Sequence, residues 1–481
     1  MKRFLAIILA MAMIFTLAVS LTACKDKEKD DAVVTDNGEV NNNQSASNPL
    51  DMMEDLSSAD DFAFDAWVNE GFMDYPPVGG NEEYKLPYYN LEDKKVSFLY
   101  SSMIEYSDPS IKDSIKLAYE IDYTTVLVSP GELLNRFISM VISGDVPDVF
   151  FYGLTPALIN KGYVQPWDPY FDFSVGLWIE LKNSMDMVKF KNYHYAIDMS
   201  TGPGEVMWYN NTLFEEMGEK TPLDYYNENN WTWDTYRELS MKMTQDLTGN
   251  GVPDIWGTFL NSTTAFVYST GIDFVSLNED GTAVNNMKDA RVARAMQFYV
   301  DMIIKDKCAA TGEGDRDMFV NGQVAMLQGG IWYRTPFKEM IKNGEVNFVP
   351  FPRDPQMDKY YIGEGFGSWQ LAKGSKNPFG AAALMSGSRY NVLNSAYENR
   401  ATNDDESWLR SEWSLEMNEW YNECMFNDQV RPTLICQSIF GLQDFAGDIW
   451  YRPTQGEPWA TIAAELSPRV DDSIARALDL D

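Results

Sequence analysis

The chain has 481 residues, of which 72 are acidic and 38 basic, and its formal net charge at pH 7 is −34. A field of that sign repels nucleic acid and anionic lipid head groups, so neither is expected as a partner. The 14 Trp, 26 Tyr and 26 Phe mainly supply core packing, but they also permit a cleft in which aromatic faces stack on sugar rings.

The first 24 residues have the pattern of an export signal. Two basic residues, Lys2 and Arg3, precede an apolar run over residues 4–19, and Leu-Thr-Ala-Cys24 follows it. A cysteine in this setting resembles the bacterial lipobox, in which the thiol takes a diacylglyceryl group and becomes the mature N-terminus. We therefore predict a signal peptide over residues 1–23 and a lipid anchor, with fatty chains such as palmitate, at Cys24 on the outer face of the cell membrane. An ordinary signal peptide with a chance cysteine is the alternative.

Residues 24–92 are predicted to be a lipidated N-terminus, a flexible tether and an extension. Residues 25–49 contain no aromatic residue and almost no apolar period, so they cannot bury enough surface to offset their ordering entropy. The remaining length, about 430 residues, exceeds one compact core and predicts two lobes.

Strand and helix patterns alternate along this body. In chain order we expect a strand over 95–100, a helix over 133–142, a strand over 146–151 and helices over 155–160, 233–243 and 292–303. Pro130 and Gly144 bound the first helix, and Thr232 caps the helix over 233–243. The alternation predicts an α/β fold with largely parallel sheets and helices on both faces. Ligands in such folds bind beyond the carboxyl ends of the strands.

Cysteine and histidine exclude several kinds of site. Besides Cys24 the chain has Cys308, Cys424 and Cys436 in no metal-ligand spacing, and we expect buried free thiols, with a Cys424–Cys436 disulfide as the alternative. The single histidine, His194, excludes a zinc site with two histidines and an HExxH peptidase. No Gly-x-Ser-x-Gly motif supplies a nucleophile for a serine triad. Carboxylate-pair chemistry of the glycosidase kind stays open, because so many acidic residues make pairs inevitable.

One loop resembles a calcium site. The segment DLTGNGVPD would place five oxygen ligands at alternating positions, with glycine at the sixth: Asp246, Thr248, Asn250, Val252 and Asp254. The twelfth position is Gly257, so the bidentate glutamate is missing and any calcium would bind weakly. We favour a metal-free Asx-type turn, and predict no other cofactor.

Five blocks in order resemble the extracellular solute-binding proteins that feed ABC importers, in particular the group that includes maltose-binding protein. They are SGDVPDV (143–149), GYVQPWD (162–168), VMWYNNTLF (206–214), FVNGQVAM (319–326) and KGSKNP (373–378). The resemblance spans roughly residues 93–390, and the residues after 390 fit only in outline.

This resemblance implies a periplasmic-binding-protein-like clamshell of type II, in which two α/β lobes joined by three hinge crossings close on a solute. We place the crossings near Gly204–Tyr209, Glu364–Trp369 and Asn427–Thr433. Lobe 1 then comprises residues 93–204 and 366–430, and lobe 2 comprises residues 205–365 and 431–481.

The resemblance also implies residues of the cleft. Tyr152 and Trp332 lie where the family presents aromatic platforms, although Tyr152 could be a surface tyrosine. Trp369 could stack on the solute or pack the hinge. The remaining candidates are polar groups that can hydrogen-bond to sugar hydroxyls: Asp198, Glu205, Tyr209 and Asn261. For Asp198, Glu205 and Asn261 the alternative is a position in a solvated loop.

These features predict a non-enzymatic, monomeric binding lipoprotein. It would capture a small solute, with an oligosaccharide favoured, by hinge closure and deliver it to the permease subunits of an ABC importer. Its other partner would be the membrane, through the lipid anchor. The alternatives are a surface glycan-cleaving enzyme that uses a carboxylate pair, and a binding protein for a non-sugar solute such as a peptide.

Overall fold

The computed structural model describes residues 53–57, 70–101, 119–199, 204–367, 369–401, 415–437 and 439–479. The predicted signal peptide, Cys24 and most of the tether lie outside these ranges. None of the helices within them has the length and apolar character that crossing a membrane requires.

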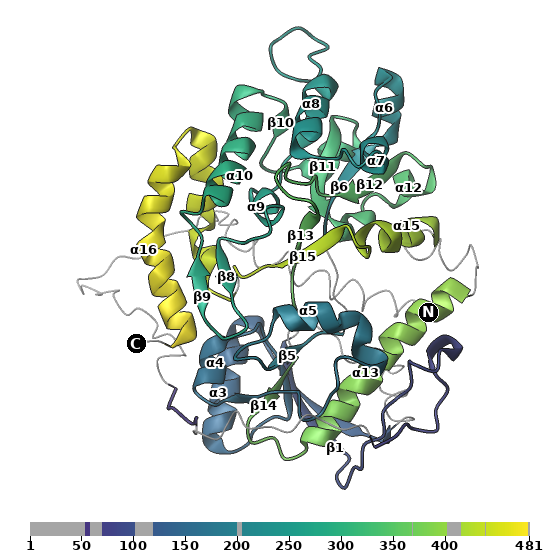
Figure 1. The fold of residues 1–481 in the computed structure, drawn as a ribbon, viewed down its shortest axis with the longest axis vertical. Helices are drawn as coiled ribbons and strands as arrows, with labels where there is room; N and C mark the ends of the chain where they lie inside the picture. The colour runs from purple at the N-terminus through teal and green to yellow at the C-terminus, as the bar shows by residue number, and fades with distance from the viewer. Residues whose placement is uncertain are drawn as a thin grey trace, which may run out of the picture.

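Two sheets form two lobes, one above the other in Figure 1. The sheet of lobe 1 has the order β2-β1-β3-β14-β4, with β5 paired to β14, and that of lobe 2 has the order β10-β7-β11-β6-β12. The strands of lobe 1 are β1 (Lys95–Ser101), β2 (Asp122–Val128), β3 (Val149–Phe151), β4 (Val164–Gln165), β5 (Ala196–Ile197) and β14 (Trp369–Ala372). Those of lobe 2 are β6 (Glu205–Asn210), β7 (Trp256–Phe259), β10 (Ala309–Ala310), β11 (Val324–Gly330) and β12 (Val346–Pro350).

Helices cover the sheets in both lobes. Lobe 1 carries α3 (Leu133–Ser143), α4 (Pro156–Asn160), α5 (Lys182–Met187) and α13 (Pro378–Ala401). Lobe 2 carries α6 (Asn211–Met217), α7 (Pro222–Asn227), α8 (Trp233–Met243), α9 (Thr264–Tyr268), α10 (Ala290–Val300), α11 (Asp315–Val320), α12 (Lys338–Lys342) and α15 (Leu415–Met425). A hairpin of β8 (Val275–Leu277) and β9 (Ala283–Asn285), a pair of strands β13 (Tyr360–Glu364) and β15 (Val430–Leu434), and the C-terminal α16 (Trp459–Leu478) complete the fold.

The predicted elements are present, and local chemistry explains their ends. Gly144 ends α3 in the left-handed conformation at φ 75°, and Thr232 caps α8 in a capping box with Thr235. The strand predicted over 146–151 covers only 149–151, because Pro147 has no N–H to donate to the sheet. Along β1, Phe98 and Tyr100 face one apolar cluster and Leu99 faces another, so both faces of the sheet are buried as predicted.

The chain crosses between the lobes from β5 to β6 and again from β13 to β14, as expected. The third crossing differs from the prediction at Asn427–Thr433. That segment leads into β15, which pairs in parallel with β13, and Trp420 Nε1 of the preceding α15 donates to Phe348 O of β12 at 2.7 Å. Residues 415–430 therefore pack with lobe 2, whereas the prediction assigned them to lobe 1.

The helix α16 contacts both lobes and runs beside them in Figure 1. Near its start, Trp459 Nε1 donates to Met287 O of lobe 2 at 3.1 Å. At its end, Asn160 Nδ2 of lobe 1 donates to Leu478 O, and Lys161 pairs with Asp479 at 3.1 Å. Residues 70–92 of the predicted extension pack against lobe 1, where Tyr390 donates to Pro76 O.

Candidate functional site

The carboxyl ends of the parallel strands in both lobes lie beside the first two crossings. In lobe 1, Phe151 at the end of β3 is paired with Trp369 at the start of β14, which places the next residue, Tyr152, beside the second crossing. In lobe 2, Gly330 at the end of β11 is paired with Glu205 at the start of β6. This is the edge at which open α/β sheets bind ligands.

A hydrogen-bonded network of side chains occupies the lobe 2 edge. Gln328 in β11 is completely buried, and its Nε2 donates to Glu205 Oε1 at 2.8 Å and to Ser262 Oγ at 3.3 Å. Its Oε1 accepts the backbone N–H groups of Asn261 at 3.1 Å and of Ser262 at 3.3 Å. One amide therefore connects the first residue of β6 to the loop that follows β7.

The network continues outward through Asn261, which is exposed. Asn261 Nδ2 donates to Gln328 O at 2.6 Å, to Asp315 Oδ2 at 3.0 Å and to Tyr333 Oη at 3.3 Å. Tyr333 Oη in turn donates to Asp315 Oδ2 at 2.6 Å. Carboxylate, amide and phenol thus meet at one partly exposed point, as recognition of hydroxyl groups requires.

Trp332 lies next to this network, and its ring packs against the backbone of two glycines. A Cβ on Gly330 would lie 2.1 Å from the indole ring, and one on Gly204 would lie 3.4 Å from it. The ring is half-buried, and within the described residues its Nε1–H has no hydrogen-bond partner. The glycines therefore let the ring approach the backbone closely at the first crossing; contact with a solute stays a prediction.

The lobe 1 edge is built differently. Asp198 is buried, and its carboxylate accepts the N–H groups of Met199 at 2.7 Å and Gly367 at 2.8 Å, so it connects the two crossings. Tyr152 is half-buried, and burial raises the pKa of its phenol. Gln370 Nε2 holds the backbone here by donating to Tyr152 O at 2.9 Å.

Two predicted residues lie inside the cores. Trp369 is 1% exposed, with its ring 4.8 Å from Phe98 and 4.4 Å from Phe151. Tyr209 is also 1% exposed, deep in β6 beside Phe214. Of the two alternatives for Trp369, hinge packing matches this burial, and neither ring presents a face to a solute in this conformation.

Two carboxyl groups of lobe 2 have raised pKa values. Burial raises the pKa of Glu205 to about 7, and the bond donated by Gln328 acts in the opposite direction. Burial also raises the pKa of Asp273 to about 7, although its carboxylate accepts the N–H groups of Cys436 and Phe274. Each therefore titrates near neutral pH.

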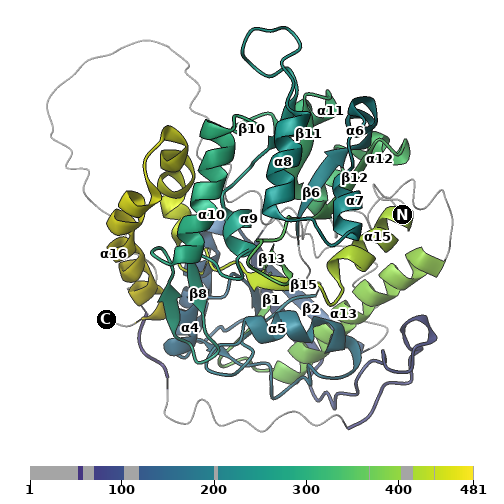
Figure 2. The same ribbon diagram turned by 45° about the horizontal axis from the view of Figure 1, so that its top comes forward.

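The loop that resembles a calcium site satisfies its own side-chain oxygens and projects beyond α8 (Figure 2). Asp246 accepts the N–H groups of Gly249, Asn250 and Gly251, at 2.7, 3.2 and 2.7 Å. Asp254 accepts those of Leu247 and Thr248, and Asn250 accepts that of Val252. These are the bonds of an Asx-type turn, and in the described ranges no three His, Cys, Asp or Glu side chains gather as metal ligands.

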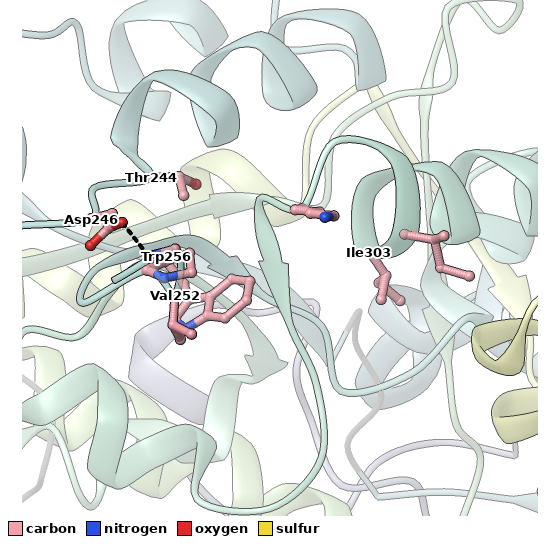
Figure 3. A pocket seen from close by; sticks show the side chains of 9 residues that line it. Thr244, Asp246, Val252, Trp256 and Ile303 are labelled. Atoms are coloured by element: carbon pink, nitrogen blue, oxygen red, sulfur yellow. Dashed lines mark hydrogen bonds between the residues drawn. The ribbon is translucent and has the colours of Figure 1, made fainter. Parts of the chain in front are cut away.

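A cavity of about 530 Å³ lies beside this loop (Figure 3). Its walls include Val252, Trp256 and Ile303, with Asp246 and Lys307 among the polar groups. Trp256 begins β7, whereas Asn261 follows its other end, so the cavity lies at the opposite end of that strand from the network.

The remaining polar candidates have structural partners. Cys308, Cys424 and Cys436 are free and buried, which confirms the prediction. His194 bridges two carboxylates, with Nδ1 2.7 Å from Asp168 and Nε2 3.1 Å from Asp186, and so joins α5 to the loop after β4.

A family model described as "Bacterial extracellular solute-binding protein" matches residues 113–386, more than half of the chain. The chain belongs to this family. No match was found among curated proteins.

Solved structures of solute-binding proteins share the two-lobed fold. The ABC substrate-binding protein Lmo0181 of Listeria monocytogenes, in complex with cycloalternan, is 17% identical with a TM-score of 0.54, over 80% of this chain and 100% of that one. The sugar-binding protein MalE of Xanthomonas citri is 17% identical with a TM-score of 0.55, over 79% of this chain and 98% of that one. UgpB of Mycobacterium tuberculosis, in complex with glycerophosphocholine, is 14% identical with a TM-score of 0.53, over 80% of this chain and 99% of that one. At such identities the likeness concerns the fold.

Sequence reasoning missed four members of the lobe 2 network, namely Ser262, Asp315, Gln328 and Tyr333. Gln328 did carry a signal, because it is a polar residue within the apolar β11 segment Val324–Gly330 and had to find partners once buried. Asp315 and Tyr333 carried none, since each is separated from Asn261 by more than 50 residues.

Proposed function

We propose that this solute-binding protein captures a carbohydrate, with an oligosaccharide favoured, between its lobes and delivers it to the permease subunits of an ABC importer. The observation that carries the proposal is the network of Asn261, Asp315 and Tyr333 beside the half-buried ring of Trp332. The network lies beside the first crossing, at the end of β11, which is the sheet edge at which open α/β folds bind ligands.

The chemistry of this edge favours a neutral, polyhydroxylated solute. Asp315 and Glu205 are acceptors for hydroxyl groups, while Asn261 can both donate and accept. A sugar ring that stacks on Trp332 or Tyr152 would gain about 1 kcal/mol from the apolar area it covers. The two carboxylates and the strongly negative chain disfavour an anionic solute.

The proposal includes a lipid anchor at Cys24, which lies outside the described residues. The described chain first appears at residues 53–57, where Leu56 N donates to Lys161 O at the end of α4. A tether from the membrane would reach the body at this point of lobe 1. Monomeric action and the absence of catalysis also belong to the proposal, and calcium plays no part in it.

A thermal-shift panel tests the proposal. The protein is incubated with maltotriose, cellotriose, xylotriose, a tripeptide and glycerophosphocholine, and both Tm and product formation are recorded. We expect at least one oligosaccharide to raise the Tm without turnover, because a ligand that prefers the native state stabilises it by mass action. Sustained hydrolysis would contradict the proposal in favour of a glycan-cleaving enzyme, and stabilisation by the tripeptide or glycerophosphocholine alone would contradict the sugar assignment.

Variants of Asn261 connect the response to the network. Asn261→Ala removes three donated bonds, and we expect it to weaken solute binding about tenfold, or about 1.4 kcal/mol. Asn211→Ala is the matched control, because Asn211 also donates to a backbone oxygen of lobe 2, Gly344 O, but lies at the other end of β6. Equal effects of the two variants would exclude a specific role for Asn261.

A further inference from the structure

The geometry assigns Gln328 the role of a positioning residue, which fixes the Glu205 carboxylate and the Asn261–Ser262 loop relative to each other for solute recognition. The assignment rests on the proposed function for its consequence in binding. Its structural content, the control of Glu205 by Gln328, can be tested without any solute.

Both ends of the Gln328 amide are committed, and they are not interchangeable. Nε2 donates to the Glu205 carboxylate at 2.8 Å, and Oε1 accepts the N–H groups of Asn261 and Ser262. A rotated amide would set oxygen against carboxylate and NH₂ against N–H, so only one orientation satisfies all partners. Because Gln328 is completely buried, water cannot replace any of these bonds.

The position of Gln328 in the fold explains how one amide can hold both Glu205 and the Asn261–Ser262 loop. It lies in β11, between β6, which begins at the first crossing, and β7, which leads into the Asn261–Ser262 loop. Glu205 comes directly after the crossing, whereas Asn261 carries the outer part of the network. No bond between Glu205 and Asn261 is needed, since each is held by the same amide.

The same bond influences whether Glu205 is ionised. Burial favours the neutral acid and the Gln328 Nε2–H favours the carboxylate, which leaves the pKa at about 7. The other ionisable groups that face Glu205 are the phenols of Tyr268 from α9 and Tyr333 from the turn after β11. Beyond Tyr333 lie Asp315, which accepts its hydroxyl, and Arg316, 5.4 Å above its ring. Removal of the Gln328 donor therefore shifts the balance toward neutral Glu205.

The test compares Gln328→Met with Gln370→Met. Methionine keeps the length of the side chain and its packing but loses the amide, and Gln370 is an equally buried glutamine in the lobe 1 sheet. Gln370 donates to the backbone oxygens of Tyr152 and Gly153 and has no bond to Glu205. Both variants should lose thermal stability, because each removes buried hydrogen bonds, so a loss of stability alone does not reveal the role of Gln328.

The decisive readout is the titration of the Glu205 carboxyl carbon in the solute-free protein, followed by NMR with ¹³C-labelled glutamate and assigned with Glu205→Gln. We expect Gln328→Met to raise the midpoint by at least about half a pH unit, and Gln370→Met to leave it unchanged. An unchanged midpoint in Gln328→Met would overturn the assignment, whether or not any sugar binds.

Solute binding supplies the second readout, with the panel oligosaccharide that raises the Tm most. We expect Gln328→Met to raise the Kd of this oligosaccharide about tenfold at pH 7.5. We also expect binding to weaken as the pH falls and Glu205 becomes neutral, and the variant should show this weakening at a higher pH than the unmodified protein. A higher Kd with an unchanged pH dependence of binding would indicate a merely structural role. Failure of every solute on the panel would count against the proposed function alone, since the solute-free titration still decides the role of Gln328.

Discussion

The two sheet edges beside the crossings differ in the groups to which their polar side chains bond. On the lobe 1 edge, Asp198 and Gln370 bond to the backbone of the crossings and of β3, and Trp369 is sealed between aromatic rings. On the lobe 2 edge, side chains bond to one another as well as to the backbone, and the network ends at the exposed Asn261. The difference suggests a division of roles: lobe 1 supports the hinge, and lobe 2, under the proposed function, binds the hydroxyl groups of the solute.

The largest expected effect concerns lobe 1 and tests whether Trp369 packs the hinge. Trp369→Ala should lower the free energy of unfolding by about 3–5 kcal/mol, because it leaves a cavity between Phe98 and Phe151. Urea denaturation measures the loss, and Trp369→Phe should recover part of it. If Trp369→Ala stays folded yet weakens binding more than a change in lobe 2 does, Trp369 contacts the solute and the division between the lobes fails.

The next effect concerns the lobe 2 side. Trp332→Ala should weaken binding of the best panel oligosaccharide by about 1 kcal/mol, roughly fivefold in Kd, because the stacking face is lost. Calorimetric titration measures the change. Trp256→Ala is the matched control, since Trp256 is also half-buried in lobe 2 but lines the distant cavity. A comparable loss from Trp256→Ala would move the binding site to that cavity.

A third prediction concerns pH. Glu205 and Asp273 both have pKa values raised to about 7 in the folded protein, above those of ordinary carboxyl groups. A raised carboxyl pKa favours folding below the unfolded pKa, and this contribution is lost as the pH rises through the folded value. We expect the free energy of unfolding to fall between pH 4.5 and pH 7.5, as these two groups ionise in the folded protein.

Asp273→Asn and Glu205→Gln should each flatten that decline, as chemical denaturation at a series of pH values would show. Because Asp273 bonds to the backbone of Cys436 and not to the network, its variant should leave the pH dependence of binding unchanged. A decline that keeps its full slope in the double variant would contradict these pKa assignments.

How far the sequence predicts this structure depends on the range of the contacts involved. Gly144 and Thr232 fix helix ends through bonds to residues three or four positions away, and Tyr152 follows a strand that its own pattern reveals. The network instead joins Glu205 to Gln328 across 123 positions, and no local pattern encodes such a meeting. The assignment of residues 415–430 to lobe 1 was wrong for the same reason, since the bond from Trp420 to Phe348 O in β12 is a long-range contact.

The smallest expected effect is on the loop of Asp246. Its oxygens are already satisfied by backbone N–H groups, so calcium or a chelator should change the Tm by less than about 1 °C. Differential scanning calorimetry with and without EDTA measures this. A clear stabilisation by calcium, lost in Asp246→Ala, would establish the metal site that we do not favour.

A crystal structure of the protein with the best panel oligosaccharide tests the central claim most directly. We expect closed lobes, a sugar ring on Trp332 and hydroxyl groups within hydrogen-bond distance of Asn261 and Asp315. A sugar bound in the cavity beside Trp256, or held by lobe 1 alone, would contradict the account.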